Sequence, residues 1–274
     1  MLETQNNLKV SIITCTYNSE KFLPKALQSI ECQTYPYIEH VINDSYSTDR
    51  TMQIIQDYIY RNQSRYEIKV IHSQPKGVGN ALNLATQAAT GDIVHYLHSD
   101  DYYLSEDALV KAVQPFLANP DLVWLTGNFV VEWKGKRLTI PQTHILHPNL
   151  EIALSVMNFI SHENTFMKTE AVQRYGGFME SKTDPVEYTL WLKLLKDHQP
   201  LIVNDEFTVF IIHKDSTSTG NIFKLMRAMN RAFHTQRNEK IFPFMGYYSE
   251  RKMYKKVRLF LTKIAQIISN PHIL

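Results

Sequence analysis

Residues 9–43, KVSIITCTYNSEKFLPKALQSIECQTYPYIEHVIN, contain the pattern that decides the fold. A β-branched run at 9–14 predicts a buried strand, and a polar turn follows it. Apolar residues then recur at helical spacing from Phe22 to Ile30, which predicts an amphipathic helix. A second β-branched run at 38–43 completes a strand–helix–strand unit, which favours a parallel sheet.

The same alternation continues along the chain. Helices are predicted at 47–59 and 77–90, and strands at 68–72 and 92–97. The four repeated units predict an α/β fold with a parallel sheet covered by helices. After residue 119 we expect strands at 122–133, 136–142 and 205–213 and helices near 149–157, 187–197 and 222–268.

Composition narrows the class of protein. The 274 residues are 44% hydrophobic and 20% charged, an ordinary globular mix. A formal net charge of +2 creates no global field for nucleic acid, so no nucleic-acid partner is expected. Two cysteines, the polar start MLETQNNLK and the lack of an apolar run of about 20 residues favour a cytoplasmic protein without a membrane span.

Polar turns follow each of the four predicted parallel strands. They read CTYN, NDSYSTD, PKG and HSDD in chain order. In open sheets of this type, ligands bind at the carboxyl ends of the strands. Four polar turns at one edge therefore suggest one shared site.

Three of these turns contain candidate ligand-binding residues. Asp100 and Asp101 are adjacent carboxylates at a strand end, and Mg²⁺ takes one or two carboxylates plus substrate phosphates. Alternatively one aspartate caps the next helix, although Ser105 already offers such a cap. Asp44 ends the second strand and could accept from a base N–H or a ribose hydroxyl, unless its turn only starts a helix. Lys76 precedes a helix N-terminus, a natural place for an anion, although alone this signal is weak.

Together the turns resemble the family 2 glycosyltransferases, which have the nucleotide-sugar-binding GT-A fold. VSIITCTYNSEKFLPKALQSIECQTYPYIEHVINDSYSTDRT is similar to the opening of that family, and KGVGNALNLATQAATGDIVHYLHSDDYY to its D-x-D segment. The resemblance continues through FISHENTFMKTEAVQRYGGFMESKTDPVEYTLWLKLL and FIIHKDSTST. It implies a Rossmann-like mixed central sheet flanked by helices. The implied domains are a GT-A domain at 1–220, with a nucleotide-binding half at 1–119 and an acceptor-binding half at 120–220, and a C-terminal helical extension at 221–274.

The resemblance also implies site residues. Thr16 and Tyr17 would line the nucleobase pocket, with Asp44 accepting from the base. The full donor-binding set would be Thr16, Tyr17, Asp44, Lys76 and Asp100. The metal ligands for Mn²⁺ or Mg²⁺ would be Asp100, Asp101 and His213, although His213 could instead contact the diphosphate.

The acceptor side is implied in the same way. Glu187 would be the general base, with Asp184 as a competitor for that role. His162 and Trp191 would lie near the acceptor, although a partly buried structural histidine is an equal reading of His162. The implied activity is inverting, hexosyltransferase-type transfer from a UDP-sugar to a hydroxyl of a glycan or lipid-linked acceptor, in bacterial cell-surface polysaccharide biosynthesis.

Several positions depart from the family's usual residues. Cys15 stands at a usual proline, Ser45 and Tyr46 replace a Gly-Gly or Asp-Gly pair, and Glu187 replaces the more usual Asp. Further departures are His98, Asn80 and Thr189. They motivate a second hypothesis, a sugar-nucleotide-binding protein without transfer activity. A nucleotidyltransferase is a third hypothesis, but it would need a Gly-rich basic loop where CTYNSE stands. The tail at 250–268, ERKMYKKVRLFLTKIAQII, has the pattern of a basic amphipathic helix. It would either contact the inner face of the cell membrane peripherally or dock on the catalytic domain.

Overall fold

A computed structural model of the chain describes residues 7–142, 150, 154, 160–180 and 186–213. The strands are β1 Val10–Thr16, β2 Ile38–Asp44, β3 Glu67–His72, β4 Ile93–Tyr96, β5 Tyr102–Tyr103, β6 Trp124–Thr126, β7 Phe129–Trp133, β8 Lys136–Ile140, β9 Thr165–Lys168, β10 Leu201–Ile202 and β11 Thr208–Ile211. The helices are α1 Leu23–Glu31, α2 Thr51–Asn62, α3 Val78–Ala88, α4 Ala108–Ala118, α6 Thr169–Arg174 and α7 Tyr188–Leu195, with a 3₁₀ helix, η2, at His162–Asn164.

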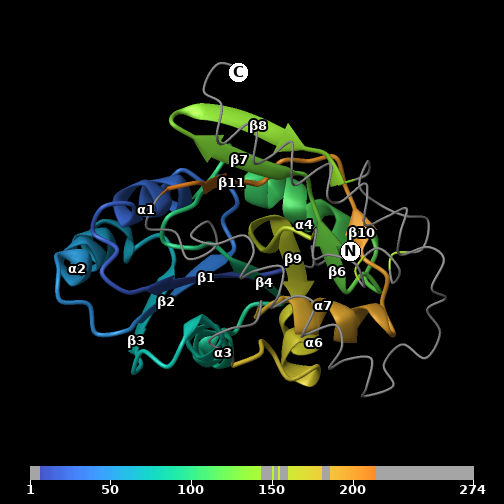
Figure 1. Ribbon diagram of the computed structural model, residues 1–274, viewed down its shortest axis with the longest axis horizontal. Helices are drawn as coiled ribbons and strands as arrows, with labels where there is room; N and C mark the ends of the chain where they lie inside the picture. The colour runs from blue at the N-terminus through green and yellow to red at the C-terminus, as the bar shows by residue number, and fades with distance from the viewer. Residues whose placement is uncertain (1–6, 143–149, 151–153, 155–159, 181–185, 214–274) are drawn as a thin grey trace, which may run out of the picture.

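These strands form two sheets (Figure 1). The seven-stranded sheet has the order β10–β6–β9–β4–β1–β2–β3, and the four-stranded sheet has the order β5–β11–β7–β8. Strands β4, β1, β2 and β3 are parallel neighbours, as the repeated strand–helix units predicted. The large sheet is mixed because β9 runs antiparallel between β4 and β6. The predicted mixed α/β fold is therefore confirmed.

Helices cover both faces of the large sheet (Figure 1). Ile13 of β1 belongs to a buried cluster with Leu82 of α3 and with residues of α6 and α7. Its neighbour Ile12 belongs to a second cluster, with Leu27 of α1 and residues of α2 and α4. Successive residues of a strand point to opposite faces, so a continuous apolar run supplies both cores.

Several local predictions were wrong. The strand expected at 122–133 is broken at Gly127, and its two parts, β6 and β7, belong to different sheets. A Cβ on Gly127 would lie 2.5 Å from the Asp205 carbonyl oxygen, so the chain turns where only glycine fits. Ser105 does not cap the following helix, which begins at Ala108; its hydroxyl instead donates to Asp107 at 2.6 Å.

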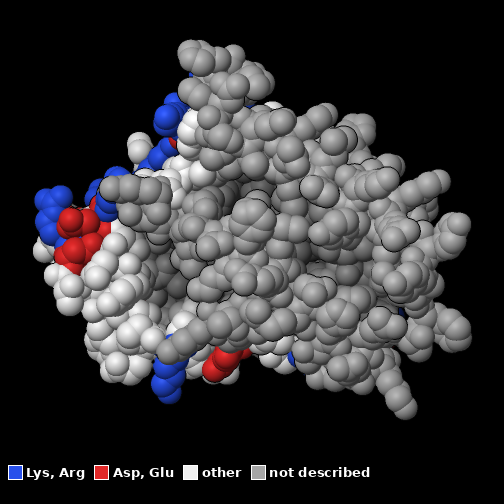
Figure 2. Space-filling view, in the orientation of Figure 1, with Lys and Arg blue, Asp and Glu red and all other residues white. Residues whose placement is uncertain are grey.

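Other predictions cannot be compared with the structure. Most of the helix expected at 149–157, and all of the extension at 221–274 with its basic tail, lie outside the described residues. Within the described ranges, no helix is both long enough and apolar enough to pass through a bilayer. Figure 2 shows basic and acidic side chains next to each other at the edge where α1 and α2 lie.

Candidate active site

The carboxyl ends of three parallel strands are in register at one edge of the large sheet. Thr16 of β1 is paired with Asp44 of β2, and Asp44 with His72 of β3. Asp44 is fully buried, and its carboxylate accepts from the Thr16 hydroxyl at 2.8 Å and from Ser47 N–H and hydroxyl at 2.9 and 2.6 Å. A carboxylate has about four acceptor positions, so Asp44 is held firmly and keeps capacity for one further donor.

The turns after β1, β2 and β4 are joined to one another. The Asn18 backbone N–H donates to the Ser47 hydroxyl at 2.9 Å, and Thr48 N–H donates to the Asn18 side-chain oxygen at 2.8 Å. The hydroxyls of Ser19 and Ser99 are 3.0 Å apart. The structure thus brings together three of the four polar turns that the sequence placed at one edge.

Exposed side chains stand on these turns. Tyr17 follows Thr16 and is 59% exposed. Lys76 is also exposed and directly precedes Gly77, whose φ of +119° suits glycine and starts α3. The predicted donor-binding residues therefore occupy the ends of adjacent strands.

The turn after β4 meets the end of β11. The Asp100 carboxylate and His213 Nε2 are 2.9 Å apart, although 113 positions separate the two residues. The His213 ring also stacks on Phe22, with ring centroids 4.1 Å apart. Antiparallel pairing of β5 with β11 holds the two segments in this register.

Asp101, which was also predicted as a metal ligand, is held by the backbone of β11. It is 1% exposed, and its Oδ1 accepts from the Ile211 backbone N–H at 3.0 Å. Oδ2 is buried and has no hydrogen-bond partner among the residues that the structure describes. Burial, together with the nearby carboxylates of Glu163 and Asp100, raises the pKa of Asp101 well above its ordinary value. Asp101 therefore anchors β11.

Of the three predicted metal ligands, the structure brings Asp100 and His213 into contact, while Asp101 Oδ1 is bonded to backbone. Over the described part of the chain, no group of three His, Cys, Asp or Glu side chains is placed to hold a metal ion. Asp100 and His213 nevertheless fit two positions of a cation site. Octahedral Mg²⁺ has ligands at ~2.0–2.1 Å, which puts adjacent ligand atoms about 3 Å apart. Their separation of 2.9 Å agrees with that spacing.

The segment that leads to Glu187 packs against the first turn of α3. It stands at the N-terminus of α7 and is partly exposed. Its neighbour Val186 accepts a backbone hydrogen bond from Met179 N–H at 3.1 Å. Both Val186 and Met179 pack against Gly79 in α3. Glu187 is thus anchored beside the helix that starts just after Lys76, whereas its competitor at position 184 lies outside the described residues.

The predicted acceptor residues lie deeper than expected. Trp191 is fully buried and stacks on Trp124, with ring centroids 5.6 Å apart, so it is a core residue in this structure. His162 is 6% exposed, and its Nε2 has no hydrogen-bond partner. Burial, and then His98 and His95, lower the pKa of His162 well below its ordinary value, so its ring is neutral. The His98 ring lies 5.2 Å from the His162 ring, which connects the HSDD turn to η2.

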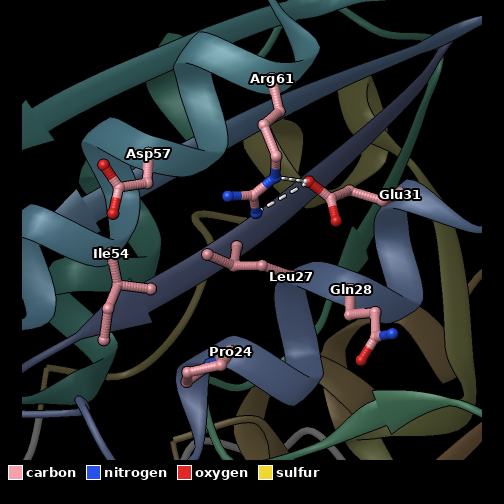
Figure 3. Close-up of a pocket in the computed structure, with 7 residues that line it drawn as sticks. All are labelled: Pro24, Leu27, Gln28, Glu31, Ile54, Asp57 and Arg61. Atoms are coloured by element: carbon pink, nitrogen blue, oxygen red, sulfur yellow. Dashed lines mark hydrogen bonds and ion pairs between the residues drawn. The ribbon is translucent and has the colours of Figure 1, made fainter.

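A separate groove lies between α1 and α2 (Figure 3). It is lined by Pro24, Leu27, Gln28, Glu31, Ile54, Asp57 and Arg61. The charged groups there are already paired: Arg61 with Glu31, and Asp57 with Gln53 at 3.0 Å. The groove does not include the polar strand ends, so it offers no competing catalytic site.

Comparisons with known proteins identify the family of the chain. Residues 11–177 match the sequence model described as Glycosyl transferase family 2. The chain is 28% identical over 224 residues to UDP-Glc:alpha-D-GlcNAc-diphosphoundecaprenol beta-1,3-glucosyltransferase WfaP of Escherichia coli, covering 81% of this chain and 84% of that protein. It is 27% identical over 210 residues to Escherichia coli chondroitin synthase, covering 76% of this chain but only 30% of that protein.

A solved structure supports the fold. TarS of Staphylococcus aureus, residues 1–349 in complex with UDP-GlcNAc, has a TM-score of 0.62 and 22% identity, covering 76% of this chain and 60% of that one. The mannosyltransferase PcManGT of Pyrobaculum calidifontis, in complex with GDP-Man and Mn²⁺, has a TM-score of 0.58 and 22% identity, covering 77% and 59%. Because the family model covers more than half of the 274 residues, the chain belongs to glycosyl transferase family 2.

Proposed function

We propose that the chain is a metal-dependent, inverting glycosyltransferase that uses a nucleotide-diphosphate sugar, a UDP-sugar, as donor. The observation that carries the proposal is the Asp100–His213 pair, 2.9 Å apart, on a turn joined by Ser19 and Ser99 to the turns that follow β1 and β2. Two relatives, WfaP and a Campylobacter jejuni glucosyltransferase, have names that specify acceptors linked to diphosphoundecaprenol or PP-undecaprenol. A glycan or lipid-linked acceptor in cell-surface polysaccharide synthesis is therefore proposed here.

The donor would lie along the carboxyl ends of the strands. Thr16, Tyr17 and Asp44 would contact the nucleoside, and Lys76 would face the diphosphate. Asp100 and His213 would hold Mn²⁺ or Mg²⁺. That cation would offset the negative charge that develops on the departing nucleoside diphosphate.

Glu187 would act as the general base. Its carboxylate would take the proton of the acceptor hydroxyl while that oxygen bonds to the anomeric carbon. The bond from the same carbon to the diphosphate oxygen breaks, and the pair of electrons leaves with the nucleoside diphosphate. One displacement of this kind inverts the anomeric centre.

Two substitutions test the assignment against a non-catalytic sugar-nucleotide-binding protein. Glu187→Gln should keep Mn²⁺-dependent UDP binding and lose transfer, measured as UDP release from a panel of UDP-sugars and acceptors. Asp100→Asn should lose the Mn²⁺ dependence of UDP affinity, measured by calorimetry with and without a chelator. If the wild-type chain binds UDP but transfers no sugar to any acceptor, the binding protein is the correct reading; unchanged turnover in Glu187→Gln refutes the base.

We also propose that residues 250–268 place the enzyme on the inner face of the membrane. Lys and Arg at the borders of an apolar face favour anionic lipid. The full chain should float with vesicles containing anionic lipid, and should float less when salt is raised. Equal recovery with neutral vesicles would contradict the proposal and favour docking of this segment on the catalytic domain.

A further inference from the structure

The turn after β2 contains an unusual backbone conformation. Tyr46 has a φ of +57°, in the left-handed region that bulky side chains rarely adopt. Glycine would occupy this conformation without steric cost. The tyrosine side chain is 53% exposed, so packing of the core does not explain why it is there. Strained positions of this kind gather at ligand-binding sites, which makes Tyr46 a candidate for function.

The surrounding contacts hold Tyr46 in this conformation. Asp44 accepts from both the N–H and the hydroxyl of Ser47, which fixes the turn on either side of Tyr46. The Tyr46 ring lies over the ring of His72 at the end of β3, with centroids 5.7 Å apart and planes inclined by 24°. The His72 side chain is 43% exposed, and its Nδ1 lies 3.8 Å from Asp44 Oδ2. The His72 ring therefore stands beside the buried carboxylate, and the Tyr46 ring lies against the His72 ring.

This pair is looser than the stacked pairs inside the protein. The buried rings of His95 and Phe166 stack with centroids 4.0 Å apart and planes inclined by 13°. At 5.7 Å, Tyr46 and His72 overlap much less, and both side chains remain open to solvent. A partly exposed aromatic ring beside an anchored turn is a surface on which a planar ligand ring can stack.

We propose that Tyr46, supported by His72, is the stacking surface for the nucleobase of the donor. The inference rests on the proposed function and adds a residue that determines affinity for the nucleoside part of the donor. The base would lie against the Tyr46 ring, beside the turn that the buried Asp44 carboxylate holds in place. Tyr17, 59% exposed at the end of the adjacent strand, borders the same place. Tyr46 would not contribute to binding of the diphosphate part of the donor.

The test compares UDP with inorganic pyrophosphate, both with Mn²⁺, by calorimetry. Tyr46→Gly should weaken UDP binding by about 5- to 100-fold, the range for loss of one base–aromatic stack. Pyrophosphate affinity should stay within about twofold. Tyr46→Phe keeps the ring and should keep the UDP affinity. Because glycine relieves the positive φ, Tyr46→Gly should not lower the melting temperature of the unliganded protein.

A matched control is available in the β7–β8 turn. Lys134 also has a positive φ, +49°, but lies in the hairpin of the other sheet. Lys134→Gly relieves the same kind of backbone strain and should change neither affinity. A second readout is the upfield ring-current shift of the uracil protons on binding, which Tyr46→Leu should abolish.

The outcomes separate the two proposals. Equal UDP affinity in the wild type and Tyr46→Gly, or an unchanged uracil shift in Tyr46→Leu, overturns the stacking role and leaves the proposed function intact. Loss of pyrophosphate and UDP affinity together in Tyr46→Gly also overturns it, because the turn would then act on the whole site. A wild-type chain that binds neither probe overturns the proposed function, and this inference with it.

Discussion

Gly79 lies in the first turn of α3, where the helix touches the backbone that leads to Glu187. A Cβ at this position would be 2.2 Å from the Met179 carbonyl oxygen, whereas a carbon–oxygen contact needs about 3.3 Å. Gly79→Ala must therefore push the two segments apart by about 1 Å, which is the difference between these distances. Met179 is hydrogen-bonded to Val186, so its displacement moves Val186 and the adjoining Glu187.

We expect kcat for Gly79→Ala to fall about 100-fold, because a misplacement of about 1 Å can cost that much. Alanine gains up to about 1 kcal/mol of helix propensity, and overpacking costs about 1–3 kcal/mol. The free energy of unfolding should therefore fall by no more than about 2 kcal/mol. UDP affinity should stay within about twofold, since the proposed nucleotide site lies at the other strand ends.

The assay pairs steady-state UDP release with calorimetric UDP binding and urea unfolding. Val78→Ala is the control, because Val78 is the neighbouring residue and is 41% exposed. It should behave as wild type in all three measurements. A Gly79→Ala variant with wild-type kcat would show that contact between α3 and the Val186 segment does not position the base.

Glu39→Gln should lower the free energy of unfolding by about 1.5–3 kcal/mol in urea titrations, because the fully buried Glu39 carboxylate accepts charged hydrogen bonds from Lys9 and Lys69. Burial alone would raise the pKa of Glu39, but its hydrogen bonds outweigh burial and lower that pKa. The stability that Glu39 contributes is therefore present above about pH 4.3, the ordinary pKa of Glu, and is lost as the pH falls below that value. Equal free energies of unfolding for Glu39→Gln and the wild type at pH 7 would contradict the prediction. Burial lowers the pKa of His40 and of His95 to about 3, so the unfolded chain takes up protons first as the pH falls below about 6.5. Each histidine then lowers the free energy of unfolding by up to about 1.4 kcal/mol per pH unit. His40→Gln should therefore reduce the slope of the free energy of unfolding against pH by the amount that corresponds to one proton. An unchanged slope would argue against a buried neutral His40 ring. Burial raises the pKa of the Cys15 thiol to about 12, so N-ethylmaleimide should label the exposed Cys32 and spare Cys15 in the native protein, as read by mass spectrometry.

The parallel half of the fold was predictable because its signals are local. Strand and helix periods alternate within short windows, and the polar turns mark the strand ends. The break at Gly127 was not predictable, since residues 122–133 read as one strand and the turn depends on the approach of Asp205. Strand β9 was missed because TFMK has no alternation, and its place between β4 and β6 is set only by tertiary pairing.

The site was predictable to a similar extent. The strand-end rule predicted that Asp44 and Asp100 lie at one edge of the sheet, and the structure shows His213, a residue implied by the resemblance, in contact with Asp100. The rule could not separate Asp100 from Asp101, because the partner of Asp101 is a backbone N–H 110 positions later. Burial of Trp191 is likewise a property of the packed protein. The substituted turn at Tyr46 was visible in the sequence, but its backbone conformation was not.

The pairing of β5 with β11 has a consequence for synthesis on the ribosome. The segment up to residue 103 includes the strands that hold Asp44, so its hydrogen bonds to Thr16 can form early. The histidine that faces Asp100 is translated 113 positions after it. Contacts between such distant positions form late, since the intervening chain must first be ordered. We therefore expect a nascent chain stalled before position 213 to lack cation-dependent binding, and an arrested-chain series should show that binding begins abruptly once β11 has left the exit tunnel.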